Sequence, residues 1–140
     1  MQLTTLPIAS RAAAPRSCSV LLADTSLEAR ELIEKSLATL RPDVVTHAES
    51  GDELDRLFFH QGPFDLVVCR ALLGARSGLQ VVARARAAGR RASFIIYSSL
   101  EGPWLRVFVS DAQGTVLSSR VVSLDGLAGL AEGMLEAQRR

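Results

Sequence analysis

The stretch FDLVVCR, residues 64–70, decides the fold of this chain. Within it, residues 66–69 form a short, unbroken apolar run that contains two β-branched side chains and is followed by the charge of Arg70. Such runs are typical of strands that are buried on both faces of a parallel sheet. Residues 20–23 and 94–97 form two further runs of the same character. The sequence therefore predicts several buried parallel strands.

Apolar residues recur at helical spacing between these runs. One stripe in residues 27–40 consists of Ala29, Leu32, Ile33, Leu37 and Leu40, and one in residues 51–60 consists of Leu54, Leu57 and Phe58. Strands that alternate with helices of this length favour right-handed crossovers and a doubly wound α/β sheet.

The residues that directly follow the apolar runs are the candidate site residues. In doubly wound sheets, ligands bind outside the carboxyl ends of the strands, near the switch in strand order. Asp24, Arg70 and Ser98 occupy these positions. We expect their side chains to lie near one another.

The chain resembles the receiver domain of bacterial response regulators over about residues 18–138. The resemblance lies in the order and spacing of short segments: VLLAD (20–24) followed by Arg30, AESGDEL (48–54), FDLVV (64–68), SGL (77–79) and IIYS (95–98). It implies a flavodoxin-like (βα)5 fold with a doubly wound parallel five-stranded sheet of order 2-1-3-4-5. Residues 1–17 are expected to form a flexible leader and residues 18–140 the receiver-like domain.

The same resemblance implies that phosphoryl transfer has been lost. Receivers hold Mg²⁺ with two adjacent acids after the first strand and phosphorylate an Asp after the third. Here Asp24 is followed by Thr25, and Arg70 stands in the acceptor position. Arginine stays protonated, cannot attack phosphorus and repels Mg²⁺. We expect a degenerate phosphorylation pocket with no bound metal and no cofactor.

Receivers also place a Lys after the fifth strand, and two positions compete for it here. Counting forward from Ser98 reaches Arg120, whereas counting from Ala112-Gln113-Gly114 as a turn reaches Ser118. The first keeps a cation near the pocket and the second does not. Both remain open from the sequence.

Each pocket residue also has a purely structural interpretation. Arg70 either pairs with Asp24 and locks the pocket or extends its guanidinium into solvent. Asp24 either serves the pocket or caps the turn into the first helix. Ser98 either belongs to the site or caps a loop.

A fourth helix is predicted from Gly102-Pro103 onward, where apolar residues crowd two turns. In receivers the fourth helix, fifth strand and fifth helix form the usual face for dimerisation and output. The last helix is predicted over residues 124–138. The candidate interface residues on these two helices are Trp104, Leu105, Val107, Phe108, Leu127 and Leu130. The alternative is that Trp104 and Phe108 fill the core.

Composition favours a single cytoplasmic domain. The 140 residues are 48% hydrophobic with a net charge of +1, and no apolar run is long enough to span a membrane. Two cysteines without metal-ligand spacing give neither a disulfide framework nor a zinc site. The basic residues at 84–91 are expected at a solvated helix end. Contact of this domain with nucleic acid is therefore not expected.

These observations predict a non-enzymatic, phosphorylation-independent pseudo-receiver that acts in two-component-type regulation by recognising a protein partner or a second copy of itself. One alternative is the regulatory part of a transcription factor whose DNA-binding domain lies outside this chain. Another is a flavodoxin-like domain that binds a small anion at Asp24, Arg70 and Ser98.

Overall fold

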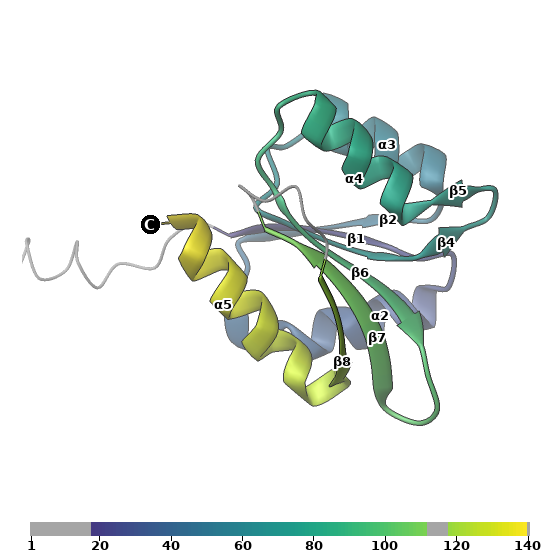
Figure 1. The fold of residues 1–140 in the computed structure, drawn as a ribbon, viewed down its shortest axis with the longest axis vertical. Coiled ribbons are helices and arrows are strands. Elements are labelled where there is room, and N and C mark those ends of the chain that lie inside the picture. Colours follow the sequence, from purple (N-terminus) through teal and green to yellow (C-terminus); the bar gives the residue numbers. More distant parts are fainter. Residues whose placement is uncertain (1–17, 112–117, 140) are drawn as a thin grey trace, which may run out of the picture.

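A six-stranded mixed sheet lies between two pairs of helices in the computed structural model, which describes residues 18–111 and 118–139 (Figure 1). The main sheet contains β1 (Ser19–Ala23), β2 (Val44–Ala48), β3 (Leu66–Arg70), β6 (Ser93–Ser99), β7 (Trp104–Ser110) and β8 (Ser118–Ser123). A separate two-stranded ribbon consists of β4 (Leu72–Leu73) and β5 (Arg76–Ser77). The predicted leader, residues 1–17, lies outside the described residues.

The helices are α2 (Leu27–Ser36), α3 (Gly51–His60), α4 (Gly78–Ala87) and α5 (Leu127–Arg139), with short 3₁₀ turns η1 (Ala38–Leu40) and η2 (Leu124–Gly126). Helices α2 and α5 cover one face of the sheet, and α3 and α4 cover the other (Figure 1). Ser26, Ser50 and Ser77 cap the N-termini of α2, α3 and α4, since each side-chain oxygen accepts a backbone N–H of the first turn.

Two apolar cores fill the space on either side of the sheet. The core beneath α2 and α5 contains alternate residues of the strands, such as Leu22, Val68 and Tyr97. The core beneath α3 and α4 contains the residues between them, such as Leu21 and Val67. This division follows from the alternation of side chains along a strand. It confirms that the central strands are buried on both faces.

The predicted fold class, a doubly wound α/β fold, is confirmed. The main sheet has the order β2-β1-β3-β6-β7-β8, and β2, β1, β3 and β6 pair in parallel. These four strands have the relative positions 2-1-3-4 that the sequence predicted. The far end of the sheet differs, because β7 pairs antiparallel with both β6 and β8. The sheet therefore has one strand more than predicted.

The predicted fourth helix is wrong, because residues 104–110 form the strand β7. Its burial alternates residue by residue: Leu105, Val107 and Val109 are buried, whereas Trp104 and Arg106 are exposed. A period of two with β-branched and aromatic residues is the signature of a strand with one covered face. The helical interpretation gave weight to apolar content and missed this alternation.

A tight turn rather than a helix start occupies residues 100–103. Gly102 has a φ of 65°, a left-handed conformation that glycine adopts without strain. The N–H of Leu100 donates to the oxygen of Trp104 at 2.9 Å, which closes the hairpin. Because β7 is antiparallel to both of its neighbours, β8 runs in the same direction as the four parallel strands. It is separated from β6 by β7, whereas the predicted fifth strand would lie next to β6.

The stripe predicted for the first helix needs a smaller correction. Ile33 and Leu37 are buried as expected, but Leu32 is 54% exposed and Arg30 is buried instead. The helix ends at Ser36, and a 3₁₀ turn follows it, so the register of the longer stripe does not continue.

Candidate functional site

Asp24 directly follows β1 and is fully buried. Its Oδ1 accepts the backbone N–H of Ser26 at 2.9 Å, and its Oδ2 accepts the hydroxyl of Tyr97 at 2.5 Å. The first contact shapes the turn into α2, whose N-cap is Ser26. Both oxygens of this buried carboxylate are therefore engaged within the domain.

Tyr97 is the site residue that the sequence analysis missed. It lies near the end of β6 with its ring buried, directly opposite Arg70 on β3. Burial raises the pKa of Tyr97, and the hydrogen bond to Asp24 raises that pKa further. The phenol is therefore a proton donor at neutral pH. The signal was available in the sequence, since a hydroxyl-bearing aromatic residue near a strand's carboxyl end reaches the same edge of the sheet as Asp24.

Arg70 ends β3 and lies beside Asp24. Its Nη1 is 3.8 Å from Oδ2 of Asp24, while its side chain is 44% exposed. The two predicted alternatives therefore both contribute: the guanidinium reaches solvent and also balances the buried carboxylate. Because Arg70 is partly exposed and the pair is long, solvent screening limits its contribution to stability to about 1 kcal/mol.

Ser98 and Thr25 do not join this cluster. Ser98 is within β6, and because side chains alternate along a strand it lies on the opposite face of the sheet from Tyr97. Thr25 is exposed in the turn after Asp24. A shared site of Asp24, Arg70 and Ser98 stays a prediction, because the contacts of the described residues join Asp24 to Arg70 and Tyr97. The cluster that forms is Asp24, Arg70 and Tyr97.

Arg120 and Ser118 also lie away from the cluster. Arg120 pairs with Val107, which in turn pairs with Tyr97, so two strand spacings of about 10 Å in total separate Arg120 from Tyr97. The antiparallel strand β7 causes this separation. Neither residue touches Asp24; both line a different pocket, against α5.

The candidate interface residues divide into two groups. Leu105, Val107 and Leu127 are buried in the core beneath α5 and cannot contact a partner. Trp104 is 49% exposed, whereas Phe108 and Leu130 are half-buried.

Among the described residues, no helix covers one face of β7 and β8 (Figure 1). Arg106 and Val121 lie opposite each other there, and Trp104 and Phe108 flank them on β7. We call these four residues the Trp104 face. Trp104 is 49% exposed and Val121 is 48% exposed, so about half of each side chain is in contact with solvent. An exposed apolar patch of this kind is typical of an interaction surface.

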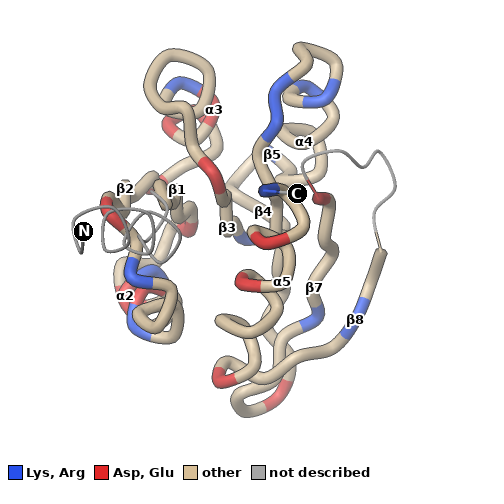
Figure 2. Tube along the Cα trace, turned by 90° about the vertical axis from the view of Figure 1, so that its left-hand side faces the viewer, with Lys and Arg blue, Asp and Glu red and all other residues tan. Residues whose placement is uncertain are grey.

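Charge is unevenly distributed between the two ends of the molecule. Figure 2 shows several basic positions on α4 but few charges on β7 and β8. The α4 arginines are engaged within the domain: Arg84 pairs with Asp55 at 2.6 Å, and Arg86 donates to the oxygens of Ala92 and Ser110. Both residues lie in the last turn of α4, as expected, and Arg84 remains 54% exposed while it pairs with Asp55.

The described residues contain no group of three or more His, Cys, Asp or Glu side chains placed to hold a metal ion. Within the same residues, no helix has the length and apolar character that a bilayer crossing needs. Cys18 and Cys69 are free and buried, and burial raises the pKa of Cys69 to about 12.

Comparison with known proteins identifies solved structures of similar fold. No protein-family model and no curated protein matches this chain. The receiver domain of a Francisella response regulator superposes with a TM-score of 0.62 at 16% identity, over 86% of this chain and 98% of that domain. The chain has the fold of a receiver domain.

Two further solved structures resemble a smaller part of this chain. The signal receiver domain of an HD domain-containing protein from Pseudomonas fluorescens has a TM-score of 0.50 at 22% identity, over 58% of this chain and 63% of that one. The N-terminal domain of an uncharacterized protein from Wolinella succinogenes has a TM-score of 0.51 at 23% identity, over 61% and 68%. At these identities the likeness is one of fold, and function has to be argued from the site.

Proposed function

We propose that this chain is a receiver-like signalling module that does not accept a phosphoryl group and acts by binding another protein. Its place would be the bacterial cytoplasm, within two-component-type regulation, and it would catalyse no reaction of its own. One observation carries the proposal: the carboxylate of Asp24 is closed off by Tyr97 and Ser26, with Arg70 beside it.

The residues do not fit the Mg²⁺ that phosphorylating receivers use. Magnesium is bound through one or two carboxylates together with waters and phosphate oxygens, in near-octahedral geometry. Asp24 is the single carboxylate of this cluster, it is fully buried, and both of its oxygens already accept hydrogen bonds. The guanidinium of Arg70 places a fixed positive charge where the metal and acceptor would be.

The Trp104 face is the surface that we assign to partner binding. It combines an exposed aromatic ring, an exposed valine and a single cation, Arg106. In receivers, the corresponding end of the domain is the one used for dimerisation and output. Because a strand has replaced the helix there, the partner would contact the sheet itself.

The small-anion alternative finds little support in the geometry. Ser98 lies on the opposite face of the sheet, and the cation Arg70 already has Asp24 as a neighbour. The transcription-factor alternative depends on residues beyond this chain and stays a prediction.

Acetyl phosphate and beryllofluoride, each with Mg²⁺, test the first half of the proposal. We expect no incorporated phosphate and an unchanged amide NMR spectrum for the wild type. Arg70→Asp should also stay inactive, because Tyr97 still holds Asp24 and Thr25 supplies no second acid. Stoichiometric base-labile phosphate on the wild-type protein would overturn the proposal.

Co-purification from the native host, together with sedimentation analysis, tests the second half. Trp104→Arg should reduce partner recovery or self-association. Leu32→Arg is a matched control, since Leu32 is similarly exposed but lies on α2. Equal behaviour of the two folded variants would place the interface elsewhere.

A further inference from the structure

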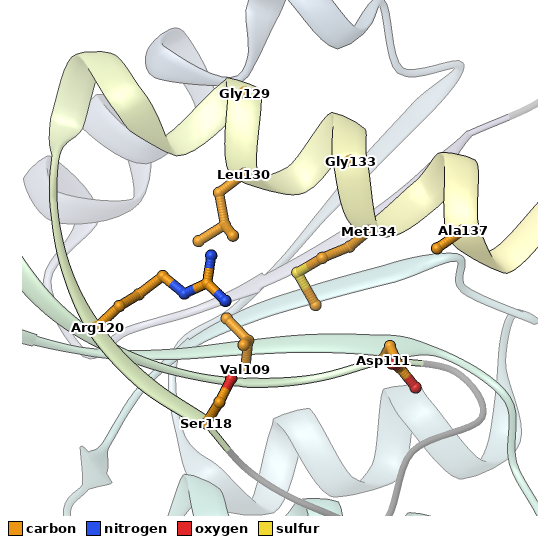
Figure 3. Close-up of a pocket in the computed structure, with 9 residues that line it drawn as sticks. All are labelled: Val109, Asp111, Ser118, Arg120, Gly129, Leu130, Gly133, Met134 and Ala137. Carbon is orange, nitrogen blue, oxygen red and sulfur yellow. The ribbon is translucent and has the colours of Figure 1, made fainter.

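A hollow of about 380 Å³ lies between α5 and the strands β7 and β8 (Figure 3). Val109 contributes to its floor, and Leu130, Met134 and Ala137 line the side formed by α5. The hollow is on the α5 face of the sheet, so it is separate from the Trp104 face. It is also separate from Asp24, which does not line it.

Two glycines one helical turn apart give the hollow its depth. Gly129 and Gly133 both line it, and a Cβ added at either position would have no atom within 4 Å. Neither glycine has a positive φ, so the backbone does not require glycine at these positions. Glycine is unfavourable within a helix, and here its effect is to leave open space beside the strands.

Arg120 brings the charge of the hollow. Figure 3 shows its guanidinium extending across the hollow toward Leu130. Across residues 18–111 and 118–139, no ion pair or hydrogen bond engages this guanidinium. Ser118 is two residues earlier on the same face of β8, and its hydroxyl is a second donor at the rim.

The charges favour a singly charged anion. One arginine forms a bidentate pair with a carboxylate, which matches the two oxygens in geometry. Asp111 also lines the hollow, and its negative charge disfavours a doubly charged phosphate. The volume is within the range of about 300–1,000 Å³ that is typical of small-molecule pockets.

We propose that this hollow binds a small amphipathic monocarboxylate, whose carboxylate pairs with Arg120 and whose apolar body lies against Leu130 and Met134. The site is distinct from the pocket around Asp24 and independent of partner binding at the Trp104 face. It would let the level of such a carboxylate stabilise α5 against β8.

Octanoate, followed by amide NMR titration of the full chain, is the direct probe. We expect saturable shifts concentrated in β8 and α5, with a dissociation constant on the order of 0.1 to 1 mM for a ligand of this size. Octanol, which lacks the charge, should bind more weakly at the same place. Octylammonium, which has the opposite charge, should not bind.

Two variants separate the charge from the space. Arg120→Gln should weaken octanoate binding about tenfold and leave octanol unchanged, because only the ion pair is lost. Gly133→Leu fills the hollow and should abolish binding of both compounds, while leucine's helix propensity keeps α5 folded. Absence of saturable octanoate binding, or binding that neither variant reduces, would overturn the proposal.

Discussion

The two ends of the sheet are covered differently. Strands β1, β3 and β6 have helices on both faces, and β3 is buried along nearly its whole length. Strand β7 is buried on alternate residues from 104 to 109, and β8 is mostly exposed. A hairpin therefore takes the place of a covering helix at one end. This exchange exposes the Trp104 face and moves Arg120 away from Asp24.

The two ends of the sheet also differ in how their polar side chains are engaged. At the covered end, a buried carboxylate is satisfied by a phenol and a backbone N–H, so the cluster is closed. At the partly covered end, an arginine lies in an open hollow and an aromatic side chain meets solvent. We therefore expect ligands and partners to bind at the end of the sheet that helices cover incompletely, and the end covered on both faces to be rigid.

Replacing a valine by glutamate on each of the two faces of β7 and β8 should give the largest difference in unfolding free energy. Val107→Glu places a charge in the core, where Val107 is fully buried, and should cost about 3–5 kcal/mol of unfolding free energy or prevent folding. Val121→Glu lies on the Trp104 face and should cost about 1 kcal/mol. Urea denaturation measures both. Equal losses would contradict the strand assignment of β7.

Removing the Tyr97 hydroxyl should have the next largest effect. Tyr97→Phe leaves Oδ2 of a fully buried Asp24 without its hydrogen-bond donor, which should cost about 1–3 kcal/mol. Arg70→Gln should cost less, about 1 kcal/mol, because that pair is longer and partly exposed. Urea denaturation of both variants gives the order. The reverse order would mean that Arg70, not Tyr97, holds the carboxylate.

Alkaline pH should open the covered end. The pKa of Tyr97 is raised by burial and by Asp24, and that of Cys69 is raised to about 12 by burial. Groups with a raised folded pKa favour folding fully below their unfolded values, which are near 9 for the thiol and 10 for the phenol. Stability should therefore be constant up to about pH 9 and fall above it.

Tyrosinate absorbance reports this transition cleanly, because Tyr97 is the single tyrosine in the sequence. The phenolate signal should appear together with the loss of folded structure. Tyr97→Phe should reduce the steepness of the loss above pH 10. A phenolate that forms with an ordinary pKa in the folded protein would contradict the buried hydrogen bond.

The smallest effect is expected at the open hollow. Gly133→Ala should raise stability by about 0.5–1 kcal/mol, since alanine favours the helix and its Cβ meets open space. Thermal denaturation measures the change. Gly51→Ala is the opposite control, because a Cβ there would be 2.5 Å from Cβ of Arg76 and should destabilise. A loss of stability at Gly133 would show that the hollow is occupied by packing.

The parallel part of the fold could be predicted because its signals are local. The unbroken apolar run 66–69 is buried in β3, as expected for a strand covered on both faces, and serine caps begin helices through contacts within a few residues. The exception was residues 104–109, where apolar content suggested a helix although the alternation indicated a strand. Because of that error, the prediction lacked the strand β7 and placed Arg120 and Ser118 too close to Asp24.

The sequence by itself determined that an arginine, Arg70, follows the apolar run 66–69 and that Thr25 rather than an acid follows Asp24, because residue identity fixes charge and nucleophilicity. Only the tertiary structure decided that Tyr97 closes the carboxylate and that Ser98 lies on the other face of the sheet. It also decided that Arg120 lies in a hollow against α5. Each of these depends on which strands pair and in which direction, and pairing joins residues far apart in the chain, so no local pattern encodes it.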